Sequence, residues 1–128
     1  MSGTGWISPE AAGGGGSVIG VKLDDSVLTP KVSPVNPIDG LPNTRVWAIV
    51  QANADGSWQV DLPFPTTANA KAESGFVAAD WVAGTNHNVR LLTGSLKPND
   101  TIRSVSLPFT VTLPPVSGAT PKISGTAT

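Results

Sequence analysis

A period of two in hydrophobicity runs through residues 104–113, where Val, Leu, Phe, Val and Leu occupy every second position from 105 to 113. A helix would scatter these side chains around its circumference, whereas an extended strand places all of them on one face. The pattern therefore predicts a long strand with one buried face. Pro108 cannot donate to a sheet ladder, so it indicates that this strand lies at an edge or carries a bulge.

A β-hairpin is predicted in the middle of the chain. Residues 45–52 form an apolar run, the sequence Asn-Ala-Asp-Gly at 53–56 is typical of a turn, and residues 57–62 alternate between polar and apolar side chains. Apolar residues occur on both faces of the first strand, which favours a central position in its sheet. Trp47 and Trp58 would lie opposite each other, and we expect a core pair rather than a platform for sugars.

The composition argues against an all-helical fold. The chain of 128 residues holds 14 Gly and 12 Pro but only two Glu, and helices need residues such as Glu on their solvent faces. It has no cysteine, so neither a disulfide nor a thiolate zinc site can form. A chain of this length is expected to build one compact core. We therefore predict a single all-β domain.

Three parts are predicted along the chain: an N-terminal arm over residues 1–17, a β-domain over 18–115 and a Ser/Thr-rich tail over 116–128. The arm ends in Gly-Gly-Gly-Gly-Ser, which is flexible linker composition. Trp6 and Ile7 precede this linker, and we expect them to dock into a neighbouring subunit. The alternative is that the arm is a disordered tail.

Shorter elements are predicted within the β-domain. Residues 18–23 and 27–32 read as two short strands that form either a hairpin or two sheet edges, since an Asp-Asp-Ser turn divides them. The segment 33–43 holds three prolines and is expected to be a stiffened connection. Residues 88–93 are predicted to form a further strand.

Residues 68–83 leave two interpretations open. The segment contains six alanines, which suits a short helix near Ala78–Trp81. The alternative is a long loop in which Phe76 and Trp81 cover the open end of the core.

No catalytic residue, cofactor or metal site is predicted. The only histidine, His87, stands between two asparagines, so we expect a residue of a surface turn. Asp24 and Asp25 are neighbours that a strand would point to opposite faces, so we expect a solvated turn rather than an acid and base pair. Calcium needs about six to eight oxygens, and these carboxylates with Asp55 form no loop of suitable spacing.

Nucleic acid and membranes are also not expected as partners. The eight cations are scattered and the net charge is −1, so no basic stripe can follow a run of phosphates. The glycines at 13–16 do not open a helix after a strand, so they form no phosphate cradle. No stretch approaches the roughly 20 apolar residues that cross a bilayer, and the N-terminus lacks the pattern of a secretion signal. Synthesis and assembly in the cytoplasm are expected.

Two motifs carry a resemblance to a known class of modules. Residues 54–63 read Ala-Asp-Gly-Ser-Trp-Gln-Val-Asp-Leu-Pro and resemble a hairpin of small Ig-like and carboxypeptidase-regulatory-like β-sandwich modules. Residues 108–114 read Pro-Phe-Thr-Val-Thr-Leu-Pro and resemble the closing strand of such modules in tail and capsid-surface proteins of double-stranded DNA phages. The resemblance extends from about Arg45 to Pro115. It implies a small antiparallel β-sandwich of the Ig-like or transthyretin-like kind.

The resemblance, with the glycine-hinged arm and the Ser/Thr-rich tail, implies a non-enzymatic virion protein assembled in the host cytoplasm. We expect a capsid decoration (cement) or minor capsid protein that binds the outside of the shell and bridges coat subunits. Its partners would be the major capsid protein or other virion proteins and further copies of the chain. A homotrimer would fit the local three-fold axes on which decoration proteins often sit. The expected contact residues are Trp6, Ile7, Phe76 and Trp81.

Two other functions stay open at this point. The first is a carbohydrate or host-surface binding module of the phage tail, with a site formed by the loops around Phe76, Trp81 and His87. The second is a fragment of a bacterial surface adhesin.

Overall fold

The structure is a computed structural model that describes residues 1–8, 15–112 and 122–127. Its elements are short strands joined by long irregular segments, and the helical content of these residues is two 3-10 turns. The elements are β1 Ser2–Gly3, β2 Val18–Leu23, β3 Ala48–Gln51, β4 Trp58–Gln59, β5 Leu62–Pro63, η1 Ala72–Ser74, η2 Ala78–Trp81, β6 Asn86–Thr93, β7 Arg103–Thr110, β8 Lys122–Ile123 and β9 Thr126–Ala127.

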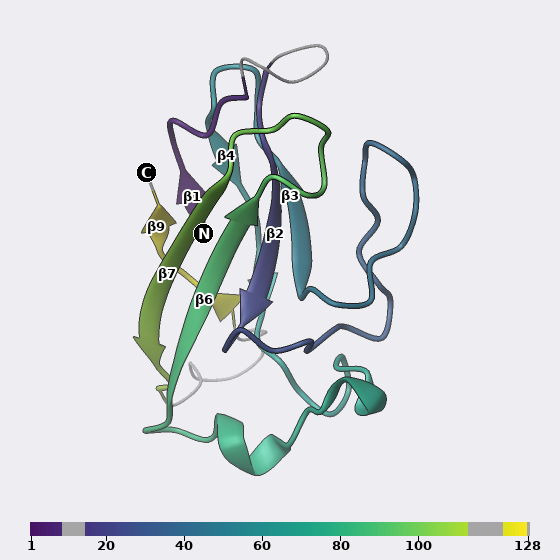
Figure 1. Ribbon diagram of the computed structural model, residues 1–128. Helices are drawn as coiled ribbons and strands as arrows, with labels where there is room; N and C mark the ends of the chain where they lie inside the picture. The colour runs from purple at the N-terminus through teal and green to yellow at the C-terminus, as the bar shows by residue number, and fades with distance from the viewer. Residues whose placement is uncertain (9–14, 113–121, 128) are drawn as a thin grey trace.

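The strands build a small β-sandwich (Figure 1). One layer is a four-stranded sheet in the order β3-β2-β6-β7, in which every neighbouring pair is antiparallel. The other layer consists of a three-stranded sheet, β4-β1-β9, and the pair β5-β8. The all-β prediction is confirmed. Neither 3-10 turn approaches the length or apolar character that a membrane-spanning helix needs, and the described residues hold no other helix.

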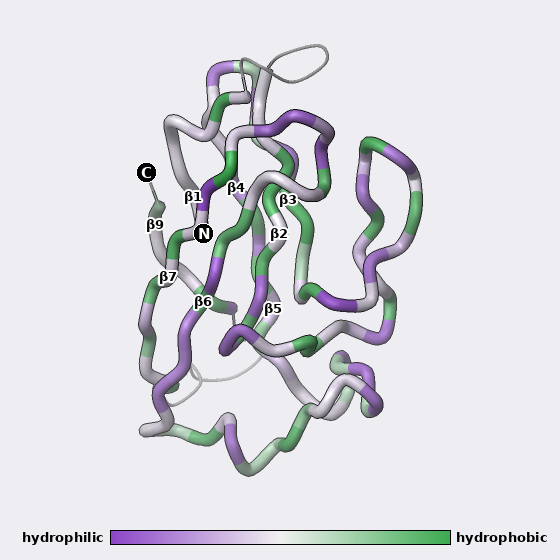
Figure 2. The backbone as a smooth tube through the Cα atoms, viewed as in Figure 1, coloured by the Kyte–Doolittle hydropathy of each residue, from purple (hydrophilic) through white to green (hydrophobic). Residues whose placement is uncertain are grey.

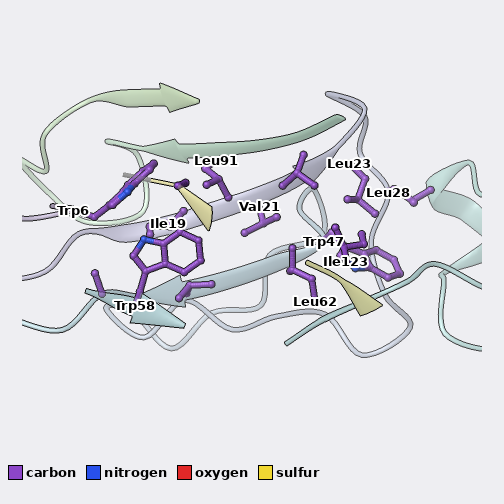
Figure 3. Packing of buried hydrophobic residues seen from close by; sticks show 14 of the residues in the cluster. Trp6, Ile19, Val21, Leu23, Leu28, Trp47, Trp58, Leu62, Leu91 and Ile123 are labelled. Carbon is purple, nitrogen blue, oxygen red and sulfur yellow. The ribbon is translucent and has the colours of Figure 1, made fainter. Parts of the chain in front are cut away.

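Side chains from both layers meet in one core (Figure 3). Ile19, Val21 and Leu23 of β2 have no exposed surface, because β2 is paired on both sides and covered by the opposite layer. Trp6 and Trp58 lie at one end of this core, and Trp47 lies at the other (Figure 3). The expectation that the tryptophans at 47 and 58 are core residues is confirmed.

The hairpin predicted over residues 45–62 does not form, although its turn does. The Asn53 N–H donates to the Ser57 carbonyl at 2.7 Å, and Gly56 takes the left-handed conformation with φ +86°. The strands on either side then diverge, since β3 pairs with β2 and β4 pairs with β1. β3 is therefore an edge of its sheet and not the predicted central strand. Divergence carries Trp58 into the second layer, where it meets Trp6 at the far side of the core.

The segments predicted as an arm and a tail contribute strands to the sandwich instead. β1 lies between β4 and β9, and β8 pairs with β5. Trp6 is 1% exposed, and Ile123 and Ala127 are each 5% exposed. They are buried because the second layer has too few strands from residues 18–112 to cover the four-stranded sheet, so the two ends of the chain complete it. Residues 9–14, 113–121 and 128, which include part of the predicted linker and most of the predicted tail, lie outside the described residues.

The remaining predicted elements are partly correct. Residues 27–32 are not a strand, because only Pro30 makes an isolated bridge, to Ala70. The strand predicted at 88–93 is confirmed as part of β6, and the long alternating strand is confirmed as β7. Residues 68–83 form a loop with the two 3-10 turns, so each interpretation of this segment is correct in part. A single 3-10 turn forms at Ala78–Trp81, and Phe76 and Trp81 pack onto the core.

Pro108 occupies the outer edge of β7, as its missing N–H requires. The Arg103 N–H donates to Thr93 Oγ1 at 2.9 Å, and the Val111 N–H donates to the Thr85 carbonyl at 2.9 Å. The backbone N–H groups of odd-numbered residues in β7 therefore point toward β6. The backbone nitrogen of Pro108, at an even-numbered position, therefore points away from β6, so its missing N–H removes no hydrogen bond between the two strands. A proline on the outer side also discourages pairing with a further strand.

Candidate functional site

His87 lies in a closely packed cluster at the start of β6. Its side chain is 6% exposed, and its ring stacks on Trp81 with centroids 3.7 Å apart and planes 5° from parallel. Nδ1 lies 2.5 Å from the Asp24 carboxylate, in the turn that follows β2. Nε2 lies 2.8 Å from the Asp80 carbonyl and 3.0 Å from Thr85 Oγ1. The prediction that His87 is a surface turn residue is therefore wrong.

The hydrogen bonds of this cluster give His87 a structural role. The Thr85 hydroxyl donates to the Val82 carbonyl at 2.7 Å, which holds Thr85 beside the ring. The Asp24 carboxylate and the Asp80 carbonyl can only accept. Each ring nitrogen of His87 lies within hydrogen-bond distance of at least one oxygen of a neighbouring segment. The cluster fastens β6 to the turn after β2 and to η2.

The carboxylates of Asp24 and Asp25 are both engaged, but by different partners. The turn predicted at these residues is confirmed, with φ values of +55° and +54°. Asp24 Oδ1 accepts the Asn88 N–H at 2.9 Å, and Asp25 pairs with the Arg90 guanidinium. The hydrogen bond from Arg90 lowers the pKa of Asp25 below its ordinary value. Across the described ranges, no three His, Asp or Glu side chains gather as metal ligands would.

A second polar cluster is buried where the N-terminal segment meets the turn between β6 and β7. The Asp100 carboxylate accepts hydrogen bonds from Ser17 Oγ at 2.8 Å and from the Val18 N–H at 3.1 Å. Burial by itself raises the pKa of Asp100, but hydrogen bonding outweighs it and the net pKa is lowered. Lys97 donates to the Gly16 carbonyl at 3.0 Å, and Arg103 donates to the Ile7 carbonyl at 2.9 Å. These contacts hold the N-terminal segment in the fold.

The four residues predicted to contact a partner do not form one surface. Trp6 packs edge to face against Trp58, with ring centroids 6.1 Å apart, and the Arg103 guanidinium lies over it. Trp81 is 8% exposed and Phe76 is half-buried. Only Ile7, at 41% exposure, presents much of its side chain to solvent. The indole of Trp6, which was predicted to dock into a neighbouring subunit, is enclosed by its own chain in this structure.

The structure instead exposes apolar side chains on the connection between β2 and β3. We call residues 32–42 the aliphatic loop; it stands beside β3 on the right of Figure 1, and Figure 2 shows hydrophobic residues along it. The exposed fractions are 86% for Val32, 54% for Val35, 44% for Ile38 and 62% for Leu41. Isolated exposed aliphatic residues are common on proteins, but four within eleven positions of one loop make a local apolar surface.

Internal hydrogen bonds give the aliphatic loop a fixed backbone. The Asn36 N–H donates to the Leu41 carbonyl at 2.9 Å, the Gly40 N–H donates to the Asn36 carbonyl at 2.9 Å, and the Asn43 N–H donates to the Pro34 carbonyl at 2.8 Å. Gly40 takes the left-handed conformation that the return of the chain requires, with φ +74°. Each proline also fixes one φ angle.

The Asn36 side chain joins the aliphatic loop to the rest of the protein. It is 6% exposed, donates from Nδ2 to the Leu96 carbonyl at 2.8 Å and accepts the Ile38 N–H at 3.0 Å. The sequence prediction recognised a stiffened connection here but missed its exposed aliphatic face. The available signal was the recurrence of Val, Ile and Leu between prolines in a segment that cannot pair regularly.

Two further apolar features lie outside this loop. Val77 and Val82 flank η2 and are 51% and 55% exposed. A shallow groove of about 210 Å³ lies between β7 and the last described residues, lined by Met1, Leu107, Phe109, Ile123 and their neighbours.

The chain was compared with protein-family models, with curated proteins and with solved structures, and none of the three comparisons found a match.

Proposed function

We propose that this chain is a non-enzymatic structural protein that attaches to a larger protein assembly. In its specific form, the proposal is a capsid decoration protein of a double-stranded DNA phage that binds the outside of the shell and bridges coat subunits. The specific form draws on the resemblance of residues 54–63 and 108–114 to modules of phage surface proteins.

The aliphatic loop is the observation that carries the proposal. Its backbone is held by its own hydrogen bonds, yet Val32, Val35, Ile38 and Leu41 are left in water. Folding of the chain gains little from these side chains, whereas covering them in a contact removes apolar surface from water. Val77 and Val82, on a separate segment, supply a second surface of the kind that a bridging protein needs.

Polar chemistry in the structure supports the same proposal, because the most elaborate side-chain clusters hold segments of the fold together. The two ring nitrogens of His87 contact the Asp24 carboxylate and the Asp80 carbonyl, and the Asp100 carboxylate accepts hydrogen bonds from a hydroxyl and a backbone amide. The alternative of a carbohydrate site around Trp81 has less support. One face of its indole is covered by His87, and Phe64 packs edge to face against it at 5.7 Å.

Quantitative mass spectrometry of purified particles tests the proposal. Intact particles from the source would be banded on a density gradient, and copies of this chain would be counted against the most abundant coat protein. A ratio near one supports a decoration protein. A few copies per particle would move the chain to the tail or collar, and absence from particles would refute a virion role.

A further inference from the structure

We propose that the aliphatic loop is the docking element of this chain and that it seats in an apolar hollow on a folded protein subunit of the assembly. This inference rests on the proposed function and adds which residues make the contact and what chemistry receives them. Val32, Val35, Ile38 and Leu41 would be the buried side chains, and Asp39, at the tip of the loop, would meet a cation inside the hollow.

Preorganisation is the first argument for docking through this loop. Association costs free energy when a segment must be ordered on binding. Here the hydrogen bonds among residues 34–43, and the bond from Asn36 to Leu96, already fix the backbone before a partner arrives. Val and Ile side chains are also branched at Cβ and lose little rotamer freedom. The loop can therefore bind as a rigid projection.

Charge at the tip of the loop favours a protein over a lipid surface. The hydrogen bonds between Asn36, Gly40 and Leu41 place residues 37–40 at the tip, and Asp39 is the charged residue there. Insertion into a bilayer would carry its carboxylate inward, at a high cost. Lys31 and Arg45, which could meet anionic lipid, lie outside the loop at its two ends. A protein hollow can instead place a cation opposite Asp39.

The size of the surface favours a multi-subunit assembly over a dimer of this chain. Each partner in a stable specific interface contributes about 800 Å², which is more than four partly exposed aliphatic side chains supply. The groove of about 210 Å³ beside β7 is also too small to receive a whole loop from a second copy. An assembly can add a second contact, for which the surface at Val77 and Val82 is available.

A matched pair of substitutions tests the inference. Val32 and Ile102 are both 86% exposed, but Ile102 lies on the turn before β7 and outside the aliphatic loop. Particles depleted of this chain would be mixed with wild type, Val32→Asp, Leu41→Asp or Ile102→Asp, and binding would be measured by co-sedimentation. Thermal melts would establish that each variant folds, which the exposure of these positions favours.

The expected result is at least about tenfold weaker binding for Val32→Asp and for Leu41→Asp, because each loses a buried aliphatic contact. Ile102→Asp should bind within about twofold of wild type. The inference is overturned if the loop variants bind like wild type, or if Ile102→Asp loses as much, while the chain still belongs to the particle. If wild type does not bind particles at all, the proposed function fails and the inference fails with it.

Two further measurements test whether the aliphatic loop binds a lipid surface or a second copy of the chain instead. Vesicles of phosphatidylcholine and phosphatidylglycerol should not co-float with the wild-type chain, and loop-dependent co-flotation would overturn the inference in favour of lipid. Sedimentation equilibrium would compare self-association of the wild-type chain with that of Leu41→Asp. The substitution should not change it, because the loop is not expected to bind a second copy. Self-association that Leu41→Asp abolishes would overturn the inference in favour of a second copy.

Discussion

The N-terminal segment around Trp6 and the aliphatic loop make an instructive contrast. Both are irregular segments with apolar side chains, yet Trp6 is 1% exposed and Val32 is 86% exposed. Trp6 finds a complementary surface within the chain, against Trp58 and beneath Arg103. The aliphatic loop is ordered by backbone hydrogen bonds and by Asn36, so its shape does not depend on burying its aliphatic side chains.

Apolar character alone therefore does not identify the segment that meets a partner. The N-terminal segment is buried because its backbone lies in close contact with the rest of the chain. A Cβ at Gly3 would lie 2.4 Å from Trp58 Nε1, and a Cβ at Gly56 would lie 2.7 Å from the Trp6 backbone nitrogen. These glycines let the segment lie flat against the core. No such approach surrounds Gly40, where a Cβ would meet open space.

The largest effect is expected from Trp6→Ala. Removing a buried indole leaves a cavity between the layers and should lower the free energy of unfolding by about 3–5 kcal/mol. Urea unfolding followed by circular dichroism would measure the loss. If Trp6 were only an anchor for a neighbouring subunit, the variant would keep the stability of the free wild-type chain. That result would contradict the assignment of Trp6 to the core.

Asp100→Asn is expected to have the next largest effect, because it disturbs the polar cluster that holds the N-terminal segment. The loss should be about 1–3 kcal/mol near neutral pH. The pKa of Asp100 is lowered in the folded chain, so its contribution is fully present above the ordinary value of 3.8 and is lost as the pH falls through the folded-state pKa.

Unfolding titrations of both proteins between neutral and acidic pH would measure this dependence. The stability of Asp100→Asn should fall less with acid than that of wild type. Asp25 and Asp55 also have lowered pKa values, through Arg90 and Ser57 respectively, so some acid dependence remains in the variant. If the free energy of unfolding fell equally with acid in the two proteins, Asp100 would not contribute to the pH dependence of stability.

Asn36→Ala should act on the aliphatic loop itself. Loss of the hydrogen bonds to Leu96 and Ile38 is expected to cost about 1 kcal/mol and to release the loop from the body of the protein. Hydrogen exchange of the loop amides should quicken severalfold, while amides of β2 keep their protection. Unchanged exchange at residues 36–43 would show that Asn36 does not order the loop.

The smallest effect is expected from Val32→Ser. With 86% of its surface in water, this side chain should change the free energy of unfolding by less than about 0.5 kcal/mol. Thermal melts of the variant and of Ile102→Ser, at an equally exposed control position, would check the value. A loss comparable to that of Trp6→Ala would mean that the loop is part of the core.

Local periodicity was a sufficient guide to individual long strands. Alternation in residues 104–113 predicted β7, the run at 88–93 predicted part of β6, and the missing N–H of Pro108 predicted an edge position or a bulge. Periodicity could not reveal that β3 and β4 part after their turn, since that depends on β1, which supplies only Ser2 and Gly3 to β4. Nor could it show that Ile123 and Ala127 would be needed to cover the core.

Candidate contact residues were harder to predict than strands. The predicted contact residues were Trp6, Ile7, Phe76 and Trp81, which are large apolar side chains in segments that were not expected to form regular strands. The same size makes them effective core residues, and here Trp6 and Trp81 are buried. The exposure of Val35 and Leu41 depends on hydrogen bonds between residues 34 and 43 that no pattern of hydropathy encodes.

Solvent-accessibility footprinting of the free chain and of the chain on its particles would show which of the two segments is covered on binding. Hydroxyl-radical labelling, read by mass spectrometry, would compare the peptide that contains the aliphatic loop with the peptide that contains Trp6. We expect Val32, Val35 and Leu41 to be labelled in the free chain and protected on particles, and Trp6 to be protected in both. Equal labelling of the loop in both states, or protection of Trp6 only on particles, would contradict this expectation.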